Sequence, residues 1–101
     1  MRVEITSQSL DRLEESLRFY LEDLGVPLER VLSIKDDLLS KAKSLSSHPY
    51  KGQLEPYLAK LKKDHRRIIE GNFKIIYRIE GDVIYVTDFF DSRKDPANMK
   101  G

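Results

Sequence analysis

The sequence contains no cysteine and no tryptophan, only four prolines, and no long apolar run. Without cysteine the chain can form neither a disulfide nor a thiolate metal site, which suits a reducing compartment. No apolar stretch approaches the ~20 residues that a membrane-spanning helix needs. Residues 1–6 lack the apolar block of a signal peptide, so we expect a cytoplasmic protein with no membrane partner.

Charge is abundant but unevenly distributed. Charged residues make up 35% of the chain, above the ~25% usual in globular domains. We expect residues 1–101 to form a single domain, because this length supports one modest core. The net charge is only +1, yet residues 60–78 hold seven Lys and Arg against two Asp and Glu, a local charge of +5. A basic block in a nearly neutral chain indicates an anionic partner.

The N-terminal half predicts a strand followed by two helices. Residues 2–6 alternate in polarity, as strands do, and Thr6 or Ser7 can cap a helix that starts there. Leucines then recur at three- and four-residue spacing. Gly25 is placed to end this helix in a left-handed conformation, and Pro27 fits the first turn of a second helix with an apolar face. Because the junction is short, the two helices should form an antiparallel hairpin.

The C-terminal half predicts strands, because the apolar period changes to two from His65 onward. Gly71-Asn72 is a favourable two-residue hairpin turn. This turn predicts three cross-strand pairs: Ile69 with Lys74, Arg67 with Ile76, and His65 with Arg78. Residues 83–90 are apolar on both faces, as in a central strand, and their register stays open. Residues 53–62 could form a short helical turn or an extended lead-in.

The two faces of this hairpin differ in character. One is apolar and should pack on the helices; it holds Ile68, Phe73, Ile75, Tyr77 and Ile79. The other, which we call the basic face, carries His65, Arg67, Lys74 and Arg78. We expect the basic face to point toward solvent or a partner, where it could contact phosphate or an acidic protein surface. A solvated sheet face whose charges prevent aggregation is the alternative.

Two sequence runs resemble a known family. Arg-Arg-Ile-Ile-Glu-Gly-Asn-Phe-Lys-Ile-Ile-Tyr-Arg-Ile at 66–79 and Ser-Arg-Lys-Asp-Pro at 92–96, after a strand and two helices, are similar to the RelE/ParE superfamily of type II toxins. The resemblance implies an α+β fold, in which a small curved antiparallel sheet carries an N-terminal antiparallel helical hairpin on one face, in the order β-α-α-β-β-β. It also implies a bacterial protein that arrests growth and is neutralised by a cognate antitoxin.

The branches of this superfamily differ in mechanism. ParE-like members bind and poison DNA gyrase, with no established catalytic residues. RelE-like members cut mRNA on the ribosome, where basic side chains stabilise charge at the phosphate. The RelE-like alternative would place its catalytic groups at His65, Arg67, Lys74 and Arg93.

The C-terminal residues favour the ParE-like branch. The late tyrosine of RelE-like members falls near Met99, and Asp91 stands where many relatives carry histidine. The Arg-Lys-Asp-Pro ending also looks more like the ParE-like branch. An inactive member that only binds antitoxin is a third alternative.

The resemblance and the basic block together suggest target-binding residues: Arg67, Lys74, Arg78 and Arg93. Arg93 could instead form a salt bridge with Asp91 or Asp95 at the end of the last strand. We expect His65 at the surface or an edge rather than as a catalytic base, because no oriented partner is evident. The aromatic residues at strand spacing are expected in the core: Tyr77, Tyr85, Phe89 and Phe90. The sequence suggests no metal site, cofactor or small-molecule substrate.

Overall fold

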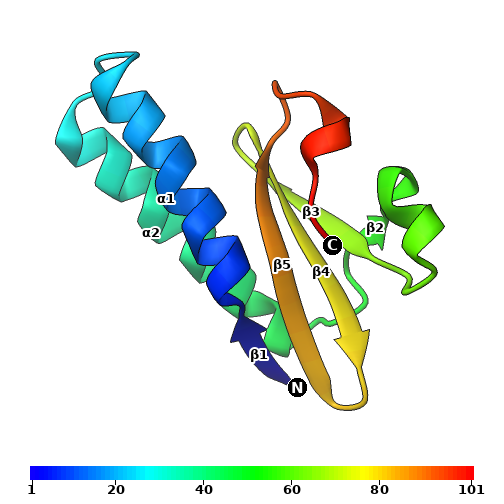
Figure 1. Cartoon of the computed structure of the whole chain (residues 1–101). Coiled ribbons are helices and arrows are strands. Elements are labelled where there is room, and N and C mark those ends of the chain that lie inside the picture. Colours follow the sequence, from blue (N-terminus) through cyan, green and yellow to red (C-terminus); the bar gives the residue numbers. More distant parts are fainter.

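The computed structural model describes residues 1–101 and contains two helices packed on a five-stranded sheet of order β1-β5-β4-β3-β2 (Figure 1). The strands are β1 (Arg2–Ile5), β2 (Gln53–Leu54), β3 (Arg66–Glu70), β4 (Phe73–Glu80) and β5 (Val83–Asp91). The helices are α1 (Ser7–Glu22) and α2 (Leu28–Lys43), with short 3₁₀ helices at Ser44–Ser46, Pro56–Leu61 and Pro96–Asn98. This architecture confirms the predicted α+β fold and its element order. The two-residue strand β2 is an additional strand that was not predicted. Neither helix is long and apolar enough to cross a bilayer.

The helical hairpin forms as predicted. The Thr6 hydroxyl accepts a hydrogen bond from the Ser9 N–H at 3.1 Å, and donates to the Val86 carbonyl at 2.7 Å. The cap that starts α1 therefore also attaches the helix to β5. Gly25 has the left-handed conformation, with φ +66°, that lets the chain turn back. Pro27 stands just before α2 rather than inside its first turn.

The strand pairings agree with the predicted hairpin turn except at one end. Ile69 pairs with Lys74 and Arg67 pairs with Ile76 across the Gly71-Asn72 turn. His65 does not pair with Arg78, because β3 begins only at Arg66. The His65 carbonyl instead accepts the Glu55 N–H at 2.8 Å.

Strand β5 occupies a central position in the sheet. It runs antiparallel to β4 and parallel to β1, so the sheet is not purely antiparallel as the family resemblance implied. The register against β4 shifts after Ile76, which pairs with Asp88, whereas Tyr77 pairs with Val86. Thr87 therefore has no partner on β4, and the strand has a local irregularity of the β-bulge kind.

Both faces of the sheet are covered. The larger core lies against the helices and includes Leu13, Leu38, Ile75, Tyr77 and Phe89. A second cluster lies on the opposite face, where the Pro56–Leu61 helix and the C-terminal segment pack; it consists of Leu58, Ile76, Phe90 and Met99. Figure 1 shows these two segments on the side of the sheet away from the helical hairpin. The basic face is therefore only partly open to solvent or a partner, contrary to the expectation, because Ile76 on the same face is buried in the second cluster.

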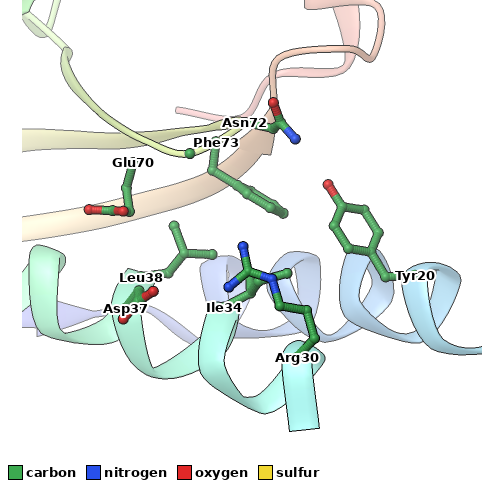
Figure 2. Close-up of a pocket in the computed structure, with 9 residues that line it drawn as sticks. Tyr20, Arg30, Ile34, Asp37, Leu38, Glu70, Asn72 and Phe73 are labelled. Atoms are coloured by element: carbon green, nitrogen blue, oxygen red, sulfur yellow. The ribbon is translucent and has the colours of Figure 1, made fainter. Parts of the chain in front are cut away.

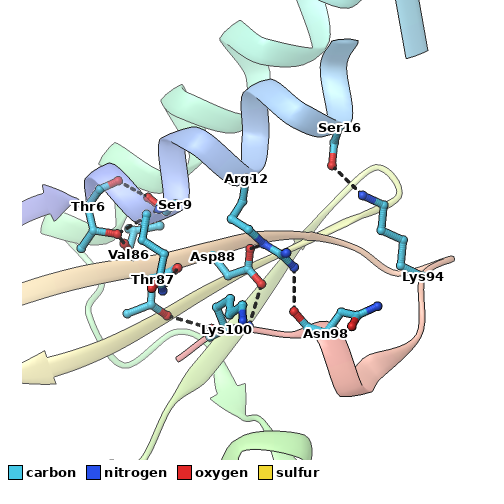
Figure 3. Close-up of polar contacts among 11 residues, drawn as sticks. Thr6, Ser9, Arg12, Ser16, Val86, Thr87, Asp88, Lys94, Asn98 and Lys100 are labelled. Atoms are coloured by element: carbon cyan, nitrogen blue, oxygen red, sulfur yellow. Dashed lines mark hydrogen bonds and ion pairs between the residues drawn. The ribbon is translucent and has the colours of Figure 1, made fainter. Parts of the chain in front are cut away.

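A buried ion pair holds the C-terminal segment in place (Figure 3). The fully buried carboxylate of Asp88 accepts hydrogen bonds from Arg12 Nε at 3.2 Å and from the Lys100 N–H at 2.9 Å. Arg12 Nη2 also donates to the Asn98 carbonyl at 2.7 Å. Burial raises the pKa of Asp88, although these donors oppose the rise. One arginine thus joins α1, β5 and the segment that carries Met99.

We expect Arg12→Ala to destabilise the protein by about 3 kcal/mol, because it leaves the Asp88 carboxylate buried without its cation. Urea denaturation at neutral pH measures the loss. Arg18→Ala is the matched control, since Arg18 is an exposed arginine on the same helix. Equal stability of the two variants would contradict a structural role for the pair.

Candidate functional site

Two cations of the basic face surround one buried carboxylate. The Glu55 side chain is fully buried and caps the Pro56–Leu61 helix by accepting the Tyr57 N–H at 3.1 Å. Lys74 Nζ donates to Glu55 Oε1 at 3.0 Å, and Arg67 Nε lies 3.7 Å from the same oxygen. Arg67 also donates to the Leu54 carbonyl at 2.6 Å. The cluster therefore carries a net charge of about +1 and holds both cations in fixed positions.

Arg78 lies apart from this cluster. Its guanidinium pairs with Glu80 and lies 4.7 Å from the centre of the Tyr85 ring. Both contacts are local to the β4–β5 hairpin, and Arg78 pairs with Tyr85 across the strands.

His65 lies under the basic face rather than on it. Only 3% of the residue is exposed, contrary to the predicted surface or edge position. Neither ring nitrogen has a hydrogen-bond partner, and Gly101 packs so closely that a Cβ there would come within 2.9 Å of Nε2. Burial, together with the charges of Arg78 and Lys63, lowers the pKa of His65. The imidazole is therefore neutral near pH 7 and is enclosed by the protein.

Arg93 belongs to a different network, on the helical side of the sheet. Its Nε and Nη2 donate to the two oxygens of Asp91 at 3.1 and 2.9 Å, which confirms the predicted alternative of a salt bridge with Asp91. The buried Tyr20 hydroxyl donates to Asp91 Oδ2 at 2.8 Å and accepts from Arg93 Nη2. Asp95, the other predicted partner, instead accepts the Ala97 N–H at 3.0 Å.

This network perturbs both acidic groups. Burial alone would raise the pKa of Asp91, but hydrogen bonds from Arg93 and Tyr20 outweigh it and lower that pKa. Burial and the neighbouring Asp91 raise the pKa of Tyr20 to about 12. Near neutral pH, Asp91 is therefore ionised and pairs with Arg93, and the Tyr20 hydroxyl keeps its proton.

A small pocket opens beside this network (Figure 2). It has a volume of about 90 Å³ and lies between the two helices and the β3–β4 turn. Tyr20 and Phe73 form part of its wall, and Arg30 extends toward the sheet from α2. This volume is well below the ~300–1,000 Å³ typical of small-molecule sites.

The structure thus brings together only part of the predicted set. Arg67 and Lys74 share Glu55, Arg78 lies elsewhere on the same face, and Arg93 lies on the other face. Sequence reasoning missed Glu55, although a glutamate directly before Pro56 is a recognisable helix start. It also missed Tyr20 as a partner of Arg93, because at helical spacing Tyr20 looks like an ordinary core residue. The predicted aromatic core is confirmed for Tyr77, Phe89 and Phe90, whereas Tyr85 is partly exposed.

The helical hairpin on a mostly antiparallel sheet, with its basic strands and Ser-Arg-Lys-Asp-Pro end, defines a type II toxin of the RelE/ParE superfamily. Residues 3–96 match the model of the family described as the ParE toxin of the type II toxin-antitoxin system, parDE, and the chain belongs to this family. No curated protein matches the sequence.

The buried His65 predicts an acid-sensitive stability. In the unfolded chain His65 takes up a proton at pH ~6.5. In the folded protein His65 resists protonation, because its pKa is lowered. The free energy of unfolding should therefore fall as pH drops below about 6.5, with a slope set by this uptake. Urea denaturation in steps of about half a pH unit, from about pH 7.5 to about pH 5, measures the slope.

His65→Gln removes the titrating group, and we expect it to flatten that slope whatever its effect on absolute stability. His48→Gln is the matched control, because His48 is exposed on a loop. A His65→Gln variant with the wild-type slope would show that His65 does not cause the pH dependence.

Proposed function

We propose that this protein is a ParE-like toxin that acts in the bacterial cytoplasm by binding and poisoning DNA gyrase, and that a cognate antitoxin neutralises it. The observation that carries the proposal is the state of the side chains at the positions where RelE-like members carry proton-transfer groups. His65 is enclosed, Asp91 is bound to Arg93 and Tyr20, and Met99 is part of the second apolar cluster. The carboxylate beside Arg67 and Lys74 is that of Glu55, which is buried and paired with both cations.

Such an arrangement suits binding better than phosphodiester cleavage. Cleavage needs a group within hydrogen-bond reach of the nucleophile to accept its proton. At its surface the cluster around Glu55 offers the donors of Arg67 and Lys74 beside the exposed Tyr57, whose ring centre lies 5.6 Å from Lys74 Nζ. The Glu55 carboxylate itself is buried and occupied. Charged donors held in place by a buried partner can form directional contacts to carboxylates of an acidic protein surface. Membership in the ParE toxin family supports the same conclusion.

Removing Arg67 and Lys74 tests the binding surface. We expect Arg67→Ala/Lys74→Ala to weaken growth arrest and inhibition of gyrase supercoiling roughly 10-fold or more, because each removes charged hydrogen bonds to the target. Inhibition by purified protein, titrated against gyrase holoenzyme, measures the loss. Lys43→Ala is the control, since Lys43 is exposed at the end of α2.

Three results would contradict the proposal in different ways. Unchanged potency of the double variant, with its fold intact, would remove the basic face from target binding. Cuts in ribosome-bound mRNA would instead establish the RelE-like alternative. A lack of growth arrest by the wild-type protein would leave only a member that binds antitoxin.

A further inference from the structure

Residues 92–94 are held rigidly although they lie beyond the end of β5. The Ser92 N–H donates to the Asn72 carbonyl at 2.8 Å, so this residue is attached to the β3–β4 turn. Lys94 Nζ donates to Ser16 Oγ of α1 at 3.3 Å (Figure 3). Arg93 between them is fixed by Asp91 and Tyr20. Ser92 is therefore attached to the β3–β4 turn, Arg93 to β5 and α1, and Lys94 to α1.

The guanidinium of Arg93 keeps one of its nitrogens, Nη1, free of its partners. Its Nε and Nη2 contact Asp91, and its centre lies 5.2 Å from that of the Tyr20 ring. Nη1 makes no hydrogen bond within the chain, and the side chain is 54% exposed. Because Nη2 also donates to the Tyr20 hydroxyl, the free part of the planar fork is Nη1 with its two N–H groups. Nη1 is held in a fixed orientation and can donate a charge-assisted hydrogen bond to a carboxylate.

We propose that Arg93 is a pre-oriented contact for a carboxylate on the surface of the target, and that Tyr20 and Asp91 are the residues that position it. The inference rests on the proposed function, since it names the chemistry that one further part of the toxin recognises. An exposed salt bridge alone would add only ~0–1 kcal/mol of stability. The anchored chain and the buried Tyr20 hydroxyl instead fix a long side chain before it meets its partner, which reduces the entropy lost on binding.

The two cationic sites should contribute differently to binding. Arg67 and Lys74 exceed the charge of Glu55 by one and can attract an anionic target at long range. Arg93 and Asp91 cancel, so this pair acts only at contact distance. We therefore expect Arg93→Lys, which keeps the pair neutral, to lower target affinity without changing its dependence on salt, whereas loss of the charges of Arg67 and Lys74 changes both.

Single substitutions separate positioning from simple stability. Tyr20→Phe and Asp91→Asn should weaken growth arrest roughly 2- to 12-fold, the cost of immobilising one long side chain on binding. Arg93→Lys keeps the charge, but its single nitrogen cannot both bind Asp91 and present a second donor in the place of Nη1, so it should lose as much potency as Arg93→Ala. Tyr20→Phe/Arg93→Ala should be no weaker than Arg93→Ala alone, because Tyr20 acts through Arg93. Arg18→Ala is the exposed arginine control.

Growth arrest is measured against inducer concentration at equal protein levels, and thermal melts establish that each variant folds. Tyr20→Phe and Asp91→Asn variants that have lower melting temperatures but keep full potency would overturn the inference. An Arg93→Lys variant of wild-type potency would also overturn it. Purified gyrase should bind the Arg93→Ala variant more weakly than the wild-type protein even in the absence of DNA. A loss of binding seen only with DNA present would indicate phosphate and overturn the carboxylate assignment.

The same experiments distinguish this inference from the proposed function. If the wild-type protein arrests growth without inhibiting gyrase, the gyrase target is wrong, and the potencies of the Tyr20 and Asp91 variants still decide the role of Arg93. If the wild-type protein does not arrest growth, both proposals fail.

Discussion

Strand β5 packs against apolar side chains on both of its faces, and the rest of the structure is arranged around this burial. Val86 and Phe89 point toward the helical hairpin, whereas Phe90 points into the second cluster with Met99. A strand of this kind is stable only when both faces are covered. The hairpin covers one face, and the Pro56–Leu61 helix with the C-terminal segment covers the other. The Asp88–Arg12 pair fixes that segment, so a buried charge supports an apolar contact.

Covering the second face also determines where cations can lie. Arg67 and Lys74 remain at its margin because Glu55, at the start of the covering helix, holds them there. On the helical side, Asp91 holds Arg93 in a comparable way. In both places a nearly buried carboxylate orients a cation whose outer atoms stay accessible. This preorganisation is useful to a protein that binds a surface, whereas a nuclease would also need an accessible acid or base.

Local sequence signals predicted the elements and failed where distant segments meet. The Gly71-Asn72 turn and the alternation on either side of it predicted the β3–β4 register, since turn length alone sets side-chain parity. No local signal shows that β1 lies parallel to β5 or that Thr87 has no partner on β4, because both features depend on packing between elements far apart in the chain. The burial of His65 was missed for the same reason, as the chain that covers it arrives from Gly101. The contact between Tyr20 and Arg93 likewise joins residues from opposite ends of the sequence.

We propose that this toxin acts by binding its target and does not itself cleave RNA. The most direct measurement compares purified wild-type protein in two assays: trapping of cleaved DNA by gyrase holoenzyme, and cleavage of mRNA on translating ribosomes. We expect gyrase to accumulate broken DNA in proportion to added protein while the message stays intact. Message cut on the ribosome, with gyrase unaffected, would contradict this proposal.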